Sequence, residues 1–313
     1  MKLFLRLGCL ACLIYLQSCG GSMIKNKAAD SGQTVTKSVA HPKIPVPVAT
    51  DNLVIKEEKD LTGYWVGDFE ADMPVKDARM RGETTSEVNK INISIDAIDG
   101  EKVSGHSIVA GNFRPFTGTV KKEGTIYQFS AKEPGDDKYD GAFTFNIAEG
   151  DSALNGTWRA NNNIRIPARK YSLTKKLFHY DAAQKIEPYQ YMDMAREKDR
   201  NYKDEDGKTY SENSYLSTTE DVGKYNPSAE ILSKEQVANF KKADILILRN
   251  SIYARHGYSF KKRPLREYFD EQPWYIPVST DVKAELTPIE KQNITLLLRY
   301  EKNAKEYYDT FGR

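Results

Sequence analysis

The sequence has few cysteines, few histidines and almost no net charge, and each shortage excludes a class of protein. Only 3 cysteines occur in 313 residues and none follows Cys19, so the folded part must be stabilised by burial and not by disulfides. The 4 histidines lie in separate segments, and no zinc-binding spacing is present. With 46 basic and 44 acidic residues, the formal charge of +2 favours no nucleic acid or other polyanion as a partner.

The sequence also lacks an apolar run of the roughly 20 residues that a membrane-spanning helix needs. A shorter run, Leu7–Leu16, follows Lys2 and Arg6, and this order of charged and apolar residues is typical of an export signal. The hydrophobic share is only 39%, yet 12 Phe, 19 Tyr and 3 Trp provide enough aromatic side chains for two modest cores. At a prior of about 150 residues per domain, the length also predicts two folded domains.

The export signal ends in the sequence Leu16-Gln17-Ser18-Cys19. This sequence resembles the lipobox of bacterial lipoproteins, which implies that residues 1–18 are a signal peptide and that Cys19 carries lipid. Gly20, in a position where Asp often retains such proteins at the inner membrane, implies the outer membrane, on its periplasmic face or at the cell surface. Cys9 and Cys12 fit the lipobox poorly because they would divide the apolar run. The alternative is a soluble secreted protein.

A tether and a strand-rich region follow the signal. Residues 19–57 are polar and rich in proline without a regular period, and we interpret them as a flexible, extended tether. From residue 58 to residue 176 the period is two, as in Ile91 and Ile93, and turn-forming pairs such as Asp99-Gly100 separate the segments. The eight predicted strands span residues 63–71, 90–98, 103–109, 113–120, 125–131, 142–147, 153–160 and 165–174.

Eight consecutive strands with short connections predict an all-β antiparallel domain, either an up-and-down barrel or a sandwich. The pattern Leu-x-Gly-x-Trp occurs at residues 61–65 and 154–158. It resembles the strands of lipocalin-like and avidin-like barrels, which implies a barrel but no particular ligand. The interior is expected to hold one small ligand or to be filled by side chains, with Trp65 and Trp158 in the core. The insertion between residues 72 and 88 is a candidate lid or contact surface, and the alternative is a solvated loop.

Residues 177–224 are rich in tyrosine and in charges of both signs, and they contain few aliphatic residues. This composition favours a linker over a core-forming segment. Two acidic loops, at residues 133–141 and 204–207, lack the ligand spacing of an EF-hand calcium site. The sequence therefore predicts neither a metal site nor a cofactor.

From residue 225 to residue 313 the period becomes helical, which predicts a small, mainly α-helical domain. Its principal amphipathic helix starts at about residue 242 and ends near Tyr253. Helix start and stop signals occur at Ser233 with Gln236, Gly257, Pro264, and Thr287 with Glu290.

This region resembles the YARHG domain of bacterial envelope and secreted proteins. The resemblance rests on Leu248–Tyr258 and on the spacing of the residues that follow, namely Phe260, Tyr268, Phe269, Trp274, Tyr275, Asn293 and Ile294. It covers the chain from about residue 228 onward and implies a small extracytoplasmic helical domain, common on lipoproteins, without an assigned activity. Ser251 stands where the family often has an acid.

The candidate recognition or structural motif of this domain comprises Asn250, Tyr253, Arg255, His256, Gly257, Trp274 and Tyr275. In one interpretation the motif is structural: His256 meets the negative end of a helix dipole, and Arg255 binds the last carbonyls or an acid such as Glu267 or Asp270. In the other interpretation, Asn250, Arg255 and His256 form a polar notch that recognises an envelope component.

Arg255-His256-Gly257 also resembles the start of the active site of histidine phosphatases. In those enzymes the motif follows a buried strand, whereas here it ends a predicted helix with no second histidine nearby. We therefore expect no enzyme and no catalytic residue. The prediction is a multidomain lipoprotein of the bacterial cell envelope that recognises or scaffolds an envelope protein, a glycan or peptidoglycan. Small-molecule binding in the β-domain is the alternative.

Overall fold

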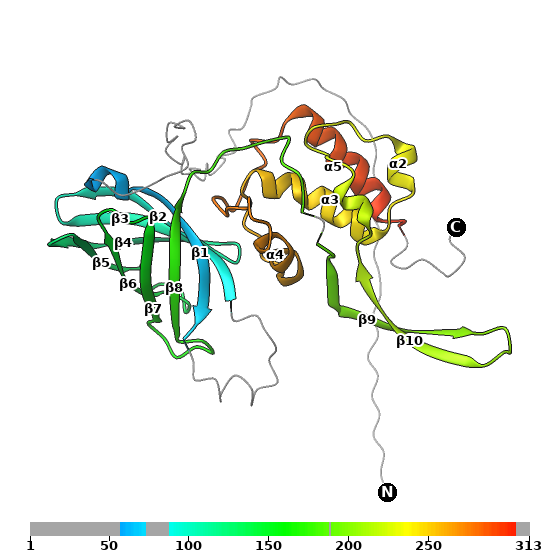
Figure 1. The fold of residues 1–313 in the computed structure, drawn as a ribbon, viewed down its shortest axis with the longest axis horizontal. Coiled ribbons are helices and arrows are strands. Elements are labelled where there is room, and N and C mark those ends of the chain that lie inside the picture. The colour runs from blue at the N-terminus through cyan, green and yellow to red at the C-terminus, as the bar shows by residue number, and fades with distance from the viewer. Residues whose placement is uncertain (1–56, 73–87, 188, 305–313) are drawn as a thin grey trace, which may run out of the picture. The chain divides into compact units, whose positions relative to one another are not determined.

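The computed structural model describes residues 57–72, 88–187 and 189–304, which form a β-domain followed by a helical domain (Figure 1). The predicted signal peptide, Cys19, nearly all of the predicted tether and the middle of the 72–88 insertion lie outside these residues. Within the part of the chain that is described, no helix is both long and apolar enough to cross a membrane.

The first domain is a closed barrel of eight antiparallel strands in sequence order. The ring closes because β1 pairs with β2 on one side and with β8 on the other, where Tyr64 lies opposite Lys176 and Ala71 opposite Arg169. Of the two predicted architectures, the barrel is confirmed. The strands are β1 (Gly63–Ala71), β2 (Val88–Asp99), β3 (Lys102–Val109), β4 (Asn112–Glu123), β5 (Ile126–Lys132), β6 (Gly141–Ala148), β7 (Ala153–Ala160) and β8 (Ala168–Lys176).

Alternation along the strands produces the barrel core. In β5, Tyr127, Phe129 and Ala131 are buried, while the residues between them are exposed. Neighbouring strands stack their inward rings on one another, and the ring centroids of Phe129 and Phe145 are 4.5 Å apart. Each fully buried ring contributes about 1.5–3 kcal/mol to stability. Side chains therefore fill much of the barrel interior.

The two Leu-x-Gly-x-Trp segments occupy different structures. Trp158 is buried within β7, as predicted, but Leu61 belongs to the 3₁₀ helix η1 (Glu58–Leu61) and not to a strand. Gly63, with φ of +111°, turns the chain from η1 into β1. Leu61 is nevertheless fully buried, and its carbonyl accepts a hydrogen bond of 2.9 Å from the Trp65 indole. Leu61 from the 3₁₀ helix and Leu154 from β7 are thus both buried in the barrel core.

We expected a linker at residues 177–224, and the structure differs there. The segment forms a hairpin, β9 (Met192–Lys203) with β10 (Thr209–Ser217), which is a two-stranded sheet. Four apolar residues around the hairpin join the core of the helical domain, namely Ile186, Tyr191, Leu216 and Val222. Because they are widely spaced among charged residues, the average composition of the segment conceals their role.

The second domain is helical, and its predicted caps are present. Ser233 Oγ accepts from the Gln236 N–H at 3.2 Å, and Thr287 Oγ1 accepts from the Glu290 N–H at 3.3 Å. Gly257, with φ of +73°, provides the predicted left-handed cap. The helices are η2 (Glu220–Gly223), α2 (Lys234–Ala238), α3 (Lys242–Arg255), α4 (Arg263–Asp270) and α5 (Pro288–Glu301).

Strand β2 contacts the helical domain through its outward-facing residues. The backbone N–H of Lys90 donates to Asp270 Oδ2 at 3.1 Å, and the side-chain amide of Asn92 donates to the Pro277 carbonyl at 2.9 Å. Asn92 is fully buried. Both domains accordingly belong to one compact unit.

Candidate functional site

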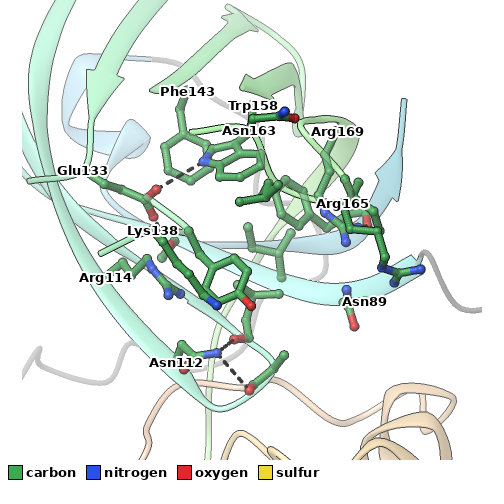
Figure 2. A pocket seen from close by; sticks show the side chains of 18 residues that line it. Asn89, Asn112, Arg114, Glu133, Lys138, Phe143, Trp158, Asn163, Arg165 and Arg169 are labelled. Carbon is green, nitrogen blue, oxygen red and sulfur yellow. Dashed lines mark hydrogen bonds between the residues drawn. The ribbon is translucent and has the colours of Figure 1, made fainter. Parts of the chain in front are cut away.

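A cavity of about 630 Å³ opens at the end of the barrel where β1 ends and β2 begins. All eight strands, or the loops next to them, contribute side chains to its lining (Figure 2). This volume lies within the range of roughly 300–1,000 Å³ that is typical of small-molecule sites. The barrel interior is therefore neither fully filled nor fully open.

The inner wall of the cavity is aromatic. Phe69, Phe143 and Trp158 line it, and each is almost completely buried. The rings of Phe69 and Trp158 meet edge to face, with centroids 5.8 Å apart and planes at 68°. Such a wall provides dispersion contacts for an apolar part of a ligand.

A buried carboxyl group, Glu133, also belongs to the wall. It accepts hydrogen bonds from the Gly141 N–H at 2.6 Å, the Trp158 indole at 3.2 Å and the Ser107 hydroxyl at 3.3 Å. Burial raises the pKa of Glu133, although the hydrogen bonds from Trp158 and Gly141 oppose that effect. The carboxyl group thereby ties three strands together at the cavity.

Four cationic side chains line the cavity as well, namely Arg114, Lys138, Arg165 and Arg169. Arg114 forms ion pairs with Asp140 at 3.1 Å and with Asp137 at 3.3 Å. Arg169 donates to the Phe69 carbonyl at 2.7 Å, and its guanidinium lies over the Phe69 ring, 4.9 Å from the centroid. The cavity thus combines apolar surface with positive charge.

The YARHG-like motif lies inside the helical domain. His256 is 7% exposed, its Nε2 lies 2.8 Å from Glu290 Oε2, and the Tyr180 ring stacks on it with centroids 4.2 Å apart. The Tyr180 hydroxyl also donates to Glu290 Oε1 at 3.1 Å. Because Glu290 belongs to the capping box of α5, His256 connects the end of α3 with the beginning of α5.

Arg255 is 3% exposed and binds within the same domain. Its Nε donates to the Gln184 carbonyl at 2.8 Å, and its Nη1 donates to the Ser251 hydroxyl at 2.8 Å. Neither Glu267 nor Asp270, the acids suggested by the sequence, is among these partners. Its Nη2 finds no hydrogen-bond partner in the described structure. Burial lowers the pKa of Arg255 to about 10.

The remaining motif residues are also held within the fold. Asn250 donates to the backbone carbonyl one turn earlier at 2.7 Å, and the Tyr275 hydroxyl donates to a backbone carbonyl at 2.7 Å. A Cβ added to Gly257 would lie 2.4 Å from a valine side chain. Tyr253 and Trp274 are half-buried. None of the seven motif residues lines the barrel cavity.

The polar residues of the cavity carry no motif that marks them as binding groups, yet one of them has a sequence signal. The inward positions Tyr127, Phe129 and Ala131 continue with period two to Glu133, which predicts an inward-facing carboxyl at the end of β5. From composition alone, the loop that begins at Glu133 suggests only a calcium site, and its ligand spacing does not fit an EF-hand. Among the described residues, no three His, Cys, Asp or Glu side chains form a cluster that could hold a metal ion.

By topology the first domain is an eight-stranded up-and-down barrel, and residues 222–302 match the YARHG domain family. The chain therefore carries a YARHG domain, as its sequence indicates. Among solved structures, it is similar to fatty-acid-binding protein 1 of Echinococcus granulosus, with 11% identity and a TM-score of 0.21, over 37% of this chain and 96% of that chain. A likeness this low transfers no function. No curated protein matches the chain.

The contacts of His256 predict a large stability loss on its removal. The change His256→Ala deletes the hydrogen bond to Glu290 and the ring stacked on Tyr180, and it leaves a buried carboxylate with one partner fewer. We expect a loss of about 2 kcal/mol or more in the free energy of unfolding, measured by urea denaturation. The matched control is His179→Ala, because His179 is exposed, and it should change stability by less than about 0.5 kcal/mol. Unchanged stability of His256→Ala would contradict a structural role.

The Glu290 carboxyl predicts acid sensitivity of the helical domain. Burial by itself would raise its pKa, but hydrogen bonds from His256 and the Thr287 N–H lower it from 4.5 to about 2. A lowered pKa stabilises the folded state above the unfolded-state value, and this contribution is lost as the pH falls from 4.5 to about 2.

The free-energy difference between the wild type and Glu290→Gln should therefore be largest near neutral pH and shrink through that window, as measured by urea denaturation at a series of pH values. The control Glu267→Gln removes an exposed acid and should give a small difference at every pH. A difference for Glu290→Gln that does not change with pH would disprove the assignment.

Proposed function

We propose that this protein is a non-catalytic binding protein that holds a small molecule in the open end of its barrel. The observation that carries the proposal is the cavity of about 630 Å³, in which a buried aromatic wall lies next to a small set of polar groups. This combination is the usual composition of a ligand pocket. A closed barrel also provides a rigid frame, because all its strands are paired.

The contacts of the YARHG motif support a function without catalysis. A catalytic histidine and arginine must reach a substrate, whereas His256 and Arg255 are buried and bound to groups of their own domain. The cavity lies in the other domain and includes no motif residue. The helical domain therefore acts as a structural partner of the barrel.

The predicted lipobox supports a place in the bacterial cell envelope. A lipid on Cys19 would hold the protein at the membrane, and residues 19–57 would hold the barrel away from it. The glycine after Cys19 favours the outer membrane. In this location the barrel would bind molecules outside the cytoplasm.

A second candidate function is recognition or scaffolding of an envelope protein, glycan or peptidoglycan. The β9–β10 hairpin favours it, because within the described residues it forms a separate sheet of only two strands. A small sheet of this kind is a surface that another chain can extend by adding a strand.

The lipid anchor is tested by substitution of the cysteines in the signal region. Cys19→Ser should abolish metabolic labelling with a radioactive fatty acid and move the protein from the membrane fraction to the soluble or secreted fraction, because it removes the acylated thiol. Cys12→Ser, which changes a cysteine that fits the lipobox poorly, should leave both readouts unchanged. Labelling that survives in Cys19→Ser would disprove the anchor.

Ligand binding is tested by filling the cavity. Val109 lines it, and Val109→Trp should abolish or strongly weaken the binding of dansyl-labelled undecanoate and of its methyl ester, measured by dansyl fluorescence with residues 19–313. The control Val88→Trp introduces the same side chain at an exposed position of β2 outside the lining. Thermal unfolding verifies that both variants are folded. Failure of the wild type to bind either probe would refute the proposed function.

A further inference from the structure

The Glu133 carboxyl narrows the class of ligand, and this inference rests on the binding function proposed above. Glu133 lines the cavity and is only 6% exposed, so its polar atoms lie deep in the wall. Figure 2 shows its carboxyl directed toward Trp158, with the hydrogen bond from the indole drawn as a dashed line. A carboxyl at this depth can hold a ligand by a directional contact if one of its oxygens accepts a further hydrogen bond.

The two oxygens of this carboxyl are used unequally. Oε2 accepts two hydrogen bonds, from the Gly141 N–H at 2.6 Å and from the Trp158 indole at 3.2 Å. Within the part of the chain that the structure describes, Oε1 accepts one, from the Ser107 hydroxyl at 3.3 Å. Because each carboxylate oxygen offers about two acceptor sites, Oε1 has room for a second donor. Ser107 also lines the cavity, so the Oε1 side of the carboxyl faces the space a ligand would occupy.

The donors around Glu133 indicate which ligand group fits Oε1. A backbone N–H and an indole N–H can only donate, so the carboxyl acts toward them as an acceptor, and a ligand group at Oε1 must be a donor as well. A carboxylate or phosphate at this position would place its negative charge against Glu133 and be repelled. A cation would lose its hydration beside the aromatic wall, which costs more free energy than burying a hydroxyl group.

We propose that the cavity binds a neutral amphipathic alcohol, whose hydroxyl group donates a hydrogen bond to Glu133 Oε1 and whose apolar part packs on the aromatic wall. The wall and the carboxyl are adjacent, because Trp158 belongs to the wall and also donates to Glu133. One molecule can therefore make both contacts. An ether of the same chain length makes the apolar contacts but has no hydrogen to donate.

The test compares a primary alcohol with its methyl ether as competitors of one probe. The probe is the methyl ester of dansyl-labelled undecanoate, bound to residues 19–313, and the competitors are n-decanol and decyl methyl ether. Decanol should displace the probe at a concentration at least about tenfold lower, since hydrogen bonds to charged groups are the strong ones. Decylamine, a cation at neutral pH, should displace the probe less effectively than decanol does.

The variant Glu133→Gln tests whether the carboxyl is the source of this preference. The amide oxygen can keep the bonds from Gly141 and Trp158, so an NH₂ group takes the place of Oε1 and donates to an alcohol and to an ether alike. The two competitors should then act at concentrations within about threefold of each other. The control Glu123→Gln removes an exposed glutamate of β4 outside the lining, and it should keep the wild-type preference.

The variant Ser107→Ala provides a second test, on which the proposal depends if thermal unfolding shows that Glu133→Gln does not fold. It removes the hydroxyl group that shares Oε1 with the ligand, so the ligand hydroxyl meets no competing donor from Ser107. The preference for decanol over the ether should rise by about threefold. A preference that stays the same or falls in Ser107→Ala would contradict the proposal.

The outcomes separate this proposal from the binding function itself. Equal displacement by alcohol and ether, with probe binding blocked by Val109→Trp, would overturn the hydroxyl assignment and leave the binding function standing. Stronger displacement by decylamine than by decanol, or binding of the undecanoate probe without its ester, would overturn the assignment in favour of a charged ligand. Binding of neither the acid nor the ester would overturn both proposals.

Discussion

The pairing of β1 with β8 is the constraint on which the barrel and its cavity depend. Without it the eight strands would form an open sheet with two free edges and no enclosed interior. Closure directs every inward side chain to one core, and where Leu61 and Trp65 lie, this core is filled. At the other end several side chains are long and charged, such as Arg114 and Arg165. Side chains do not fill the interior at this end, and a cavity of about 630 Å³ remains between them.

The helical domain depends on a different interaction, the contact between His256 and Glu290. It joins the end of α3 to the capping box of α5. The His256 side chain therefore makes a hydrogen bond to Glu290, stacks on the Tyr180 ring and contacts the N-terminus of a helix. The serine at position 251, where the family often has an acid, accepts a hydrogen bond of 2.8 Å from Arg255 Nη1. An acid there would pair with the buried guanidinium, whereas the serine provides only a neutral acceptor. The departure therefore bears on how the charge of Arg255 is balanced.

Sequence reasoning succeeded where the signal is local. Strand alternation and turn pairs predicted all eight barrel strands, and the caps at Ser233 and Thr287 predicted where two helices begin, because these patterns depend on residues close together in the chain. It missed the β9–β10 hairpin, whose charged composition resembles a linker. It also missed the pairing of His256 with Glu290 and the lining of the cavity. Both bring together residues from distant parts of the chain, and a local period indicates only the direction in which a residue such as Glu133 faces, not its neighbours.

Strand β2 faces the cavity with one set of alternating residues and the helical domain with the other. Asn89 and Ile91 line the cavity, while the intervening Lys90 and the next residue, Asn92, form hydrogen bonds with the helical domain. Successive side chains of a strand point to opposite faces, so the groups that hold β2 against the helices also fix the orientation of its cavity-facing neighbours. The YARHG domain thus positions one wall of the cavity although none of its motif residues lines it. In this protein the helical domain contributes to the site through the backbone it holds in place.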